Sequence, residues 1–502
     1  MRECVAAIDQ GTTGTRCILF GLDGVPVASA YREHRQIFPR PGWVEHDAAE
    51  ILGRVHDVCA EAVRAAAAAR ILAVGITNQR ETVVAWDAET GRPAANAIVW
   101  QDARTADACA EAIAHGWSEE VRARTGLPIS TYFSATKMRW LLEHSVEVGA
   151  LAADGRLRLG TMDAWLIWNL TGGPRGGAHI TDPTNASRTL LCRLSDLAWD
   201  ETLLELFGVP LEALPEIRPS IAREPYGFTL ADGPFGAGVP VAGDLGDQQA
   251  ALAGQGCFAP GEAKNTYGTG SFLLEVVGDT PMPSTCGLLA TAACAADGER
   301  AFALEGPVAI TGAAVQWLRD GLGLIGAAAE TEAIAASVPD SGGVYFVPAF
   351  GGLFAPHWDM TARGAIVGLT HHSNRAHLVR ATLEAICFQC REVADAMAAD
   401  SGHPFESLKV DGGATANDLL MQMQADILGV PVVRPAVRET TSLGAAFAAG
   451  LAVGAFDSTD HLRRLCRADR TFEPEWSEDR REAAFRGWRR AVDRARSWVE
   501  RA

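Results

Sequence analysis

The sequence predicts an α/β fold in which two similarly built halves, each with a mixed β-sheet flanked by helices, face each other across a cleft. Two observations carry this prediction. Strand-like runs at residues 71–77, 240–243 and 343–350 alternate with Ala-rich helical stretches, which is the pattern of an α/β protein. A strand, Gly/Thr turn, strand pattern also occurs twice, at residues 4–20 and 262–277, so the chain looks duplicated.

The composition of the chain argues against several classes of function. The chain has 62 acidic and 44 basic residues among 502, a formal charge of −18, which is the wrong sign for a protein that binds nucleic acid through its phosphates. The longest apolar stretch, residues 443–456, is shorter than the ~20 residues of a membrane span and predicts a buried helix. Residues 1–8 are too short for the apolar core of a signal peptide, so we expect a cytoplasmic location.

Glycine and proline interrupt the helical periodicity at residues 254–261, and this segment predicts the boundary between the halves. We therefore expect an N-terminal domain over residues 1–254 and a C-terminal domain over residues 255–502. Ser477 precedes a final stretch with apolar residues at helical spacing. This spacing predicts a packed helix whose arginines face solvent rather than nucleic acid.

The two Gly/Thr tips, residues 11–15 and 267–270, are the strongest functional signal. Glycines let backbone N–H groups approach an anion closely, and threonine hydroxyls add donors. One tip would indicate only a tight hairpin, but two in matching positions favour phosphate binding. None of the three lysines follows a glycine, so the P-loop pattern is absent. The GxGxxG pattern at residues 321–326 follows a helical stretch, so it predicts a helix end rather than a dinucleotide site.

Charged residues follow three of the predicted strands. Asp9 and Asp247 lie where strands end, which is where ligands bind in open α/β sheets. Asp247 is either a proton acceptor or an ordinary helix N-cap, and the sequence leaves both open. Asp244 is expected in a turn. The pair Arg80 and Glu81 places donors beside an acceptor, which suits the binding of neighbouring hydroxyls or, alternatively, a surface ion pair.

A set of motifs gives the chain its likeness to a known family. They are DQGTTGTR, PGWVEHD, GITNQRET, IVWQDART, YFSATKMRWLLEH, TDPTNASRTLL, GDQQAAL, AKNTYGTGSF, ALEG, GAAVQWLRD, VPAFGGLFAPHWD, RGAIVGLT and KVDGGATANDLLMQMQADILG. Together they resemble the FGGY family of carbohydrate kinases nearly from end to end. YFSATKMRWLLEH is specific to that family, and PGWVEHD with NQRET narrows the resemblance to its glycerol-phosphorylating members.

The resemblance implies a ribonuclease H-like fold of the actin and sugar-kinase type, with two domains around a cleft that binds ATP, Mg²⁺ and glycerol. Carried over residue by residue, the ATP site would comprise Thr12, Thr13, Gly14, Arg16, Thr269, Gly312, Gln316, Gly413 and Asn417. Glycerol would contact Arg80, Glu81, Trp100, Tyr132, Asp247, Gln248 and Phe272. Asp9 would hold Mg²⁺ through water and Asp247 would be the general base. We also expect a homo-oligomer, either a dimer or a tetramer.

The sequence departs from the family pattern at a few positions. Gly14 stands where relatives often have serine, and Ala103 and Ala135 replace an arginine and a glycine. None of these changes removes a catalytic group, so we expect nucleotide binding to survive.

The activity that the resemblance implies is ATP-dependent phosphorylation of glycerol to sn-glycerol 3-phosphate, the entry step of glycerol catabolism. Two alternatives stay open. A related kinase of a pentose or another polyol would need a roomier pocket than Trp100 and Phe272 suggest. A nucleotide-switched binding protein with an actin-like fold would turn over ATP regardless of any polyol.

A Gly-rich loop at residues 231–238 bears on regulation. In some members of the resembled family an arginine in this loop helps to bind fructose 1,6-bisphosphate, and in others a histidine in this region is phosphorylated. The loop here has neither residue and carries Asp232. Because a bisphosphate needs charge-assisted donors, we predict no inhibition by this sugar bisphosphate and no histidine phosphorylation at the loop.

Overall fold

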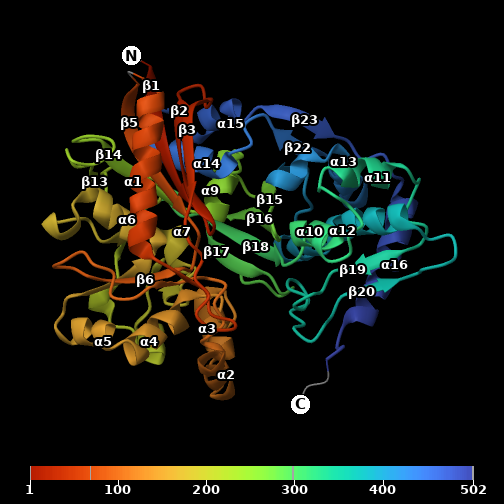
Figure 1. Ribbon diagram of the computed structural model, residues 1–502, viewed down its shortest axis with the longest axis horizontal. Helices are drawn as coiled ribbons and strands as arrows, with labels where there is room; N and C mark the ends of the chain where they lie inside the picture. The colour runs from red at the N-terminus through yellow and green to blue at the C-terminus, as the bar shows by residue number, and fades with distance from the viewer. Residues whose placement is uncertain (1, 68, 297–298, 500–502) are drawn as a thin grey trace.

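The computed structural model describes residues 2–67, 69–296 and 299–499. Its two largest sheets lie in the two halves of the chain (Figure 1). The first has the strand order β13 (Gly227–Phe228), β14 (Pro240–Gly246), β5 (Arg70–Asn78), β1 (Glu3–Gln10), β2 (Gly14–Gly21) and β3 (Pro26–Glu33). The second has the order β17 (Leu289–Ala292), β18 (Phe302–Val308), β16 (Ser271–Gly278), β15 (Ala263–Tyr267), β21 (Leu408–Asp411), β22 (Val432–Pro435) and β23 (Ala468–Phe472).

Both predicted hairpins are present. In the first, β1 and β2 pair antiparallel with Asp9 opposite Arg16, and in the second, β15 and β16 pair antiparallel with Tyr267 opposite Ser271. β1 is also parallel to β5, and β15 is parallel to β21, so both sheets are mixed. The predicted α/β class with two similarly built halves is therefore confirmed.

Helices cover both faces of the first sheet. Alternate residues of β1 point to opposite faces, so they belong to two different cores. Ile8 belongs to a core with α1 (Ala48–Ala65) and α6 (Met162–Thr171). Val5 and Ala7 belong to a separate core with α14 (Thr440–Ala452) and α15 (Thr459–Leu465). These last two helices come from the second half of the chain, and Figure 1 shows them in blue beside the red strands. The domain boundary at residues 254 and 255 stays a prediction.

α14 also packs very closely on α9 (Asp247–Gly254). A Cβ atom added at Gly254 would lie 1.9 Å from the carbonyl oxygen of Thr440, and one added at Gly444 would lie 1.9 Å from that of Ala250. Glycine at both positions therefore lets the two helices touch backbone to backbone. The buried helix predicted over residues 443–456 is found as α14, but it begins at Thr440 and ends at Ala452.

The second half has its own core around α12 (Arg375–Ser401), α13 (Asp418–Leu428) and α16 (Glu478–Ala495). Ser477 is the N-cap of α16, as predicted, and Phe485, Trp488 and Val492 of that helix are buried. In the described part of the chain, none of the helices has the length and apolar character of a transmembrane span.

The remaining elements complete the two halves. A smaller sheet has the order β4 (Glu45–His46), β7 (Ala97–Ile98), β6 (Val83–Asp87) and β8 (Leu157–Thr161). The shorter strands are β9 (Ile180–Thr181), β10 (Cys192–Arg193), β11 (Ala198–Trp199), β12 (Glu216–Ile217), β19 (Tyr345–Val347) and β20 (Ala365–Val367). The other α-helices are α2 (Ala106–Ala114), α3 (Ser118–Thr125), α4 (Ser134–His144), α5 (Val146–Ala153), α7 (Pro183–Ala186), α8 (Glu201–Phe207), α10 (Gly312–Asp320) and α11 (Glu330–Ala336).

The structure differs from two local predictions. The strand predicted over residues 343–350 is shorter, covering only Tyr345–Val347 in β19. Asp244 is not in a turn but inside β14, fully buried, because this strand continues its pairing with β5 as far as Gly246 opposite Asn78. The glycines of residues 321–326 lie between α10 and α11, as predicted.

Candidate active site at the junction of the two halves

Three parallel neighbours of the first sheet bring the predicted charged residues to one edge. Asp9 lies near the end of β1, Arg80 follows β5, and Asp247 follows β14. Asp247 is the first residue of α9 and not its N-cap, which is Gly246. Its Oδ1 atom accepts a hydrogen bond from the backbone N–H of Gln248 at 2.8 Å. The N-cap interpretation of Asp247 is therefore wrong.

Arg80 is the centre of a buried ion cluster. Its side chain is only 2% exposed, so the surface ion pair considered from sequence is excluded. The two terminal guanidinium nitrogens bind the two carboxylate oxygens of Glu305 in β18 at 2.5 and 3.1 Å. Nε lies 3.3 Å from Oδ1 of Asp247. Arg80 therefore links the edge of the first sheet to the second sheet.

Arg188 completes the cluster and was missed by sequence reasoning. Its Nε atom donates to Glu81 at 2.7 Å, and a terminal nitrogen donates to Glu305 at 3.0 Å. Arg188 occurs in the motif TDPTNASRTLL, where it is the only basic residue, and Glu305 is the only charged residue of the motif ALEG. Glu81 has a left-handed backbone, with φ of 63°, a strained conformation for a residue with a side chain and one often found at functional sites.

The carboxyl groups of the cluster differ in pKa. Burial raises the pKa of Asp247 above its ordinary value, although Arg80 and Lys264 act in the opposite direction. Burial also raises the pKa of Glu305, but Arg188 and Arg80 more than offset it and lower that pKa to about 2. Glu305 is therefore a permanent counter-ion for the arginines, whereas Asp247 is the stronger proton acceptor.

Aromatic side chains surround the charged cluster. The rings of Trp100 and Tyr132 meet edge to face with centroids 5.6 Å apart, and the guanidinium of Arg80 lies 5.9 Å from the centre of the Phe272 ring. The indole N–H of Trp100 donates to Oγ1 of Thr12 at 2.9 Å. The first Gly/Thr tip is thus joined directly to the aromatic part of the site.

Two side chains that flank the first tip contact the second half. Arg16 forms an ion pair with Glu439, and the hydroxyl of Ser442 donates to Oδ2 of Asp9 at 3.1 Å. Thr13 is exposed at the tip. A Cβ atom added at Gly14 would lie 2.5 Å from the hydroxyl of Tyr31 and 2.6 Å from the carbonyl of Arg32, so β3 approaches position 14 more closely than a side chain allows.

The second tip meets two other backbone segments. A Cβ at Gly312, the start of α10, would lie 2.5 Å from the carbonyl of Gly268, and one at Gly412 would lie 2.1 Å from the carbonyl of Tyr267. The tip, the start of α10 and the turn after β21 therefore converge. The other predicted nucleotide residues of this half lie on these segments or just after them, and are Thr269, Gln316, Gly413 and Asn417. Asn417 also caps α13 through its side chain.

Asp9 is the predicted metal-holding residue. Burial raises its pKa, against the lowering effects of Arg16 and Ser442. Within residues 2–67, 69–296 and 299–499, no group of three or more His, Cys, Asp and Glu side chains is arranged to hold a metal ion. A nucleotide-bound Mg²⁺ ordinarily uses one or two carboxylates together with phosphate oxygens and water, so a single carboxylate at this position fits that ion.

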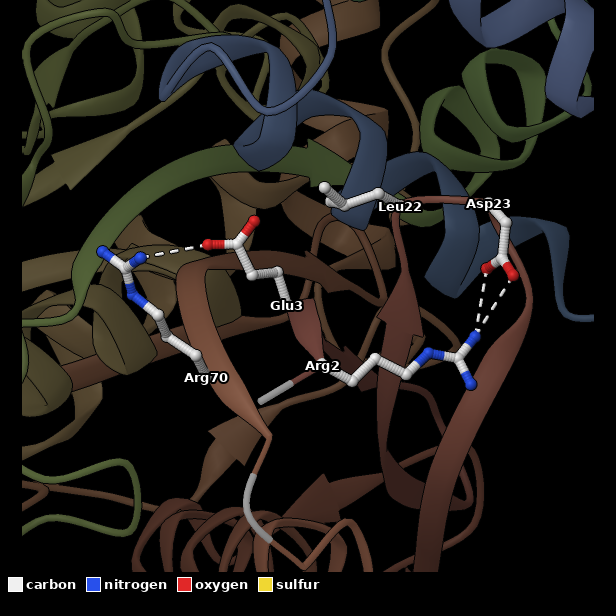
Figure 2. Close-up of a pocket in the computed structure, with 5 residues that line it drawn as sticks. All are labelled: Arg2, Glu3, Leu22, Asp23 and Arg70. Atoms are coloured by element: carbon white, nitrogen blue, oxygen red, sulfur yellow. Dashed lines mark hydrogen bonds and ion pairs between the residues drawn. The ribbon is translucent and has the colours of Figure 1, made fainter.

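A surface cavity of about 570 Å³ lies at the other end of the first sheet. Figure 2 shows its lining residues, with Arg2 paired to Asp23 and Arg70 paired to Glu3 at 3.2 and 3.0 Å. None of these residues is a predicted site residue. Its four charged residues thus pair with each other.

Comparisons with known proteins agree with this architecture. Residues 4–254 match the N-terminal domain, and residues 263–453 the C-terminal domain, of the FGGY family of carbohydrate kinases. The chain is 55% identical to a glycerol kinase of Mycolicibacterium vanbaalenii and 56% identical to one of Saccharopolyspora erythraea, with full coverage of both chains in each case. It also resembles the crystal structure of Plasmodium falciparum glycerol kinase with ADP, at 37% identity and a TM-score of 0.93, over 100% of this chain and 99% of that one.

Proposed function

The chain belongs to the FGGY family of carbohydrate kinases, and we propose that it transfers the γ-phosphoryl group of ATP to glycerol, giving sn-glycerol 3-phosphate. The observation that carries the proposal is the cluster of buried Arg80 and Glu81 with the partly exposed Asp247, beside aromatic rings. Full-length identity of 55 and 56% to two glycerol kinases supports the same activity.

The cluster suits a small polyol. Glycerol is almost wholly polar, so a site selects it by donors and acceptors that stay unpaired when a hydroxyl is missing. Arg80 supplies donors and Glu81 an acceptor, and both are buried. Trp100 and Phe272 would cover the carbon side of the substrate and would leave little room for a pentose.

Asp247 would accept the proton of the attacking hydroxyl. Its Oδ1 atom already faces Arg80 and the N–H of Gln248, so we assign Oδ2 to the substrate. A carboxylate is a weak base, but phosphoryl transfer has a loose transition state in which in-line positioning of the hydroxyl matters more than basicity. The interactions of Oδ1 fix that position.

The two tips would hold ATP from opposite sides. Backbone N–H groups near Thr12, Thr13 and Thr269 would bind phosphate oxygens, and Asp9 would hold Mg²⁺ through water. The ion, when bound, neutralises charge on the phosphates. On the other side, Gly312, Gln316, Gly413 and Asn417 would line the nucleoside.

The test is a coupled assay of ADP release with and without glycerol, followed by a panel of pentoses and longer polyols. We expect turnover that depends on glycerol and falls steeply for pentoses. Turnover that prefers a pentose would favour the related sugar kinase. ATP turnover that no polyol changes would favour a nucleotide-switched binding protein and overturn the proposal.

A further inference from the structure

Lys264 places a buried cation beside the proposed substrate residues. It lies in β15 of the second sheet and is fully buried. Its ammonium group donates to Oε1 of Gln248 at 2.6 Å and to Oγ1 of Thr266 at 2.8 Å. Gln248 follows Asp247 in the first turn of α9. A side chain of the second half therefore holds a side chain of the first half inside the site.

The hydrogen bond decides which way the amide of Gln248 points. An ammonium group can only donate, so the atom that faces Lys264 must be the carbonyl oxygen of the amide. The NH₂ group of Gln248 is then directed away from Lys264, with two protons available for an acceptor. If the ammonium were absent, nothing in this contact would distinguish the two ends of the amide.

The charges around Lys264 come from several elements. Asp411 of β21, Asp247 of α9 and Glu305 of β18 favour its charged form, and Arg80 opposes it. Burial has the largest effect and lowers the pKa of Lys264 to about 8. The ammonium is thus the charged form at neutral pH and loses its proton in a mildly alkaline range.

We propose that Lys264 is a positioning residue that fixes the amide of Gln248 so that its NH₂ group donates to a hydroxyl of the substrate. This inference rests on the proposed function and on the glycerol contact that the family resemblance implies for Gln248. Lys264 itself touches neither glycerol nor the transferred phosphoryl group in this arrangement, so its effect on the glycerol KM passes through Gln248.

The test is a double-variant cycle in the full-length enzyme, with Lys264→Met, Gln248→Met and the combination. The glycerol KM is measured at saturating ATP, and the ATP KM at saturating glycerol. We expect Lys264→Met to raise the glycerol KM about 3- to 10-fold, as the loss of one neutral hydrogen bond does. Adding it to Gln248→Met should change the glycerol KM by less than about two-fold. Multiplicative effects in the double variant would overturn the proposal.

Lys409 provides a matched control. It lies directly opposite Lys264 in the neighbouring strand β21, but its ammonium donates to the carbonyl of Gln255 at 2.9 Å. Lys409→Met should leave the glycerol KM unchanged. An equal rise of the glycerol KM in both lysine variants would show a general packing effect and contradict the proposal.

The pH dependence of the glycerol KM is a second measurement, and it does not require that a Lys264 variant folds. The glycerol KM of the parent should rise above about pH 8 as the ammonium loses its proton, while Gln248→Met should show no such rise. Lys137, whose pKa is also lowered by burial to about 8, holds backbone carbonyls at residues 131–133, so its titration would persist in Gln248→Met. A pH profile common to both proteins would refute the inference. A parent without glycerol-dependent turnover would instead refute the proposed function.

Discussion

Asp244 and Asp247 lie three residues apart but differ in their surroundings. Asp247 faces Arg80 at the junction of the two halves, whereas Asp244 is buried in β14. Burial and the negative charges of Asp163 and Asp182 raise the pKa of Asp244 far above its ordinary value. The same substitution at the two positions therefore separates a chemical role from a structural one.

Asp247→Asn should lower kcat by ~10²–10⁴-fold while ATP binding is kept, because an amide cannot accept the hydroxyl proton. The coupled ADP assay gives kcat, and nucleotide binding is measured by calorimetry. Asp244→Asn is the matched control and should retain turnover within a few-fold. If Asp247→Asn also stayed within a few-fold of the parent, Asp247 would not be the base.

Asp244 should make the parent less stable as pH rises. A carboxyl whose pKa is raised in the folded state contributes stability that is complete below its unfolded pKa of ~3.9 and is lost as pH rises through the folded pKa. Asp244→Asn removes this loss, so its advantage over the parent should grow by up to ~1.4 kcal/mol per pH unit above about pH 4. Urea unfolding at pH 5, 6 and 7 measures it. A difference independent of pH would contradict the pKa shift.

For single residues, the sequence predicted which residues lie at the candidate site better than it predicted which side chains surround them. Asp9, Arg80 and Asp247 were found because they lie at or just after the ends of strands that share one sheet edge. The burial of Asp244 and the role of Arg188 were not found, because both depend on side chains from distant parts of the chain. Periodicity and spacing within one segment carry no information about such partners.

Among the elements, the contact between α9 and α14 sets the tightest packing requirement. Gly444→Ala should lower the free energy of unfolding by about 3 kcal/mol or more, because its Cβ would overlap a backbone carbonyl that cannot move aside. Gly53→Ala is the matched control in α1, where no atom lies within 4 Å of the added Cβ, and it should stabilise the protein by roughly 0.5–1 kcal/mol. Denaturant unfolding compares the two. Equal effects would show that α9 and α14 have more space than the structure gives them.

The elements themselves were largely predictable. Both hairpins and the final helix follow from residue patterns within each segment. The covering of the first sheet by α14 could not be predicted, since the apolar pattern of residues 443–456 indicates a buried helix without indicating which sheet buries it.

For the whole molecule, Arg80 joins the two halves through Glu305. Arg80→Ala should raise the glycerol KM strongly and the ATP KM little, because it removes substrate contacts. It should also lower the free energy of unfolding by about 3–5 kcal/mol, because the buried carboxylate of Glu305 loses one of its two arginine partners and keeps only Arg188. Steady-state kinetics and urea unfolding measure these effects. Adding Glu305→Gln should recover stability but not glycerol affinity. Equal rises in both KM values would contradict the assignment of Arg80 to the substrate.

Regulation by a sugar bisphosphate at residues 231–238 should be absent. Asp232 of this loop forms an ion pair with Arg175 at 3.1 Å. The guanidinium of Arg175 therefore already binds a carboxylate. Titrating fructose 1,6-bisphosphate into the glycerol-dependent assay at physiological salt should leave the rate unchanged. Saturable inhibition that is relieved by substituting Asp232 or Gly236 would contradict this prediction.

The return of α14 to the first sheet affects how the protein is made. β14, the last long strand of that sheet, ends at Gly246, whereas α14 begins at Thr440. At ~5–20 residues per second, a ribosome needs roughly 10–40 s to add the intervening chain. Throughout that interval the sheet face with Val5, Ala7, Ile18 and Phe20, which α14 and α15 later cover, remains open to other nascent chains. This apolar face of the N-terminal half therefore lacks its covering helices until almost nine-tenths of the protein has been translated.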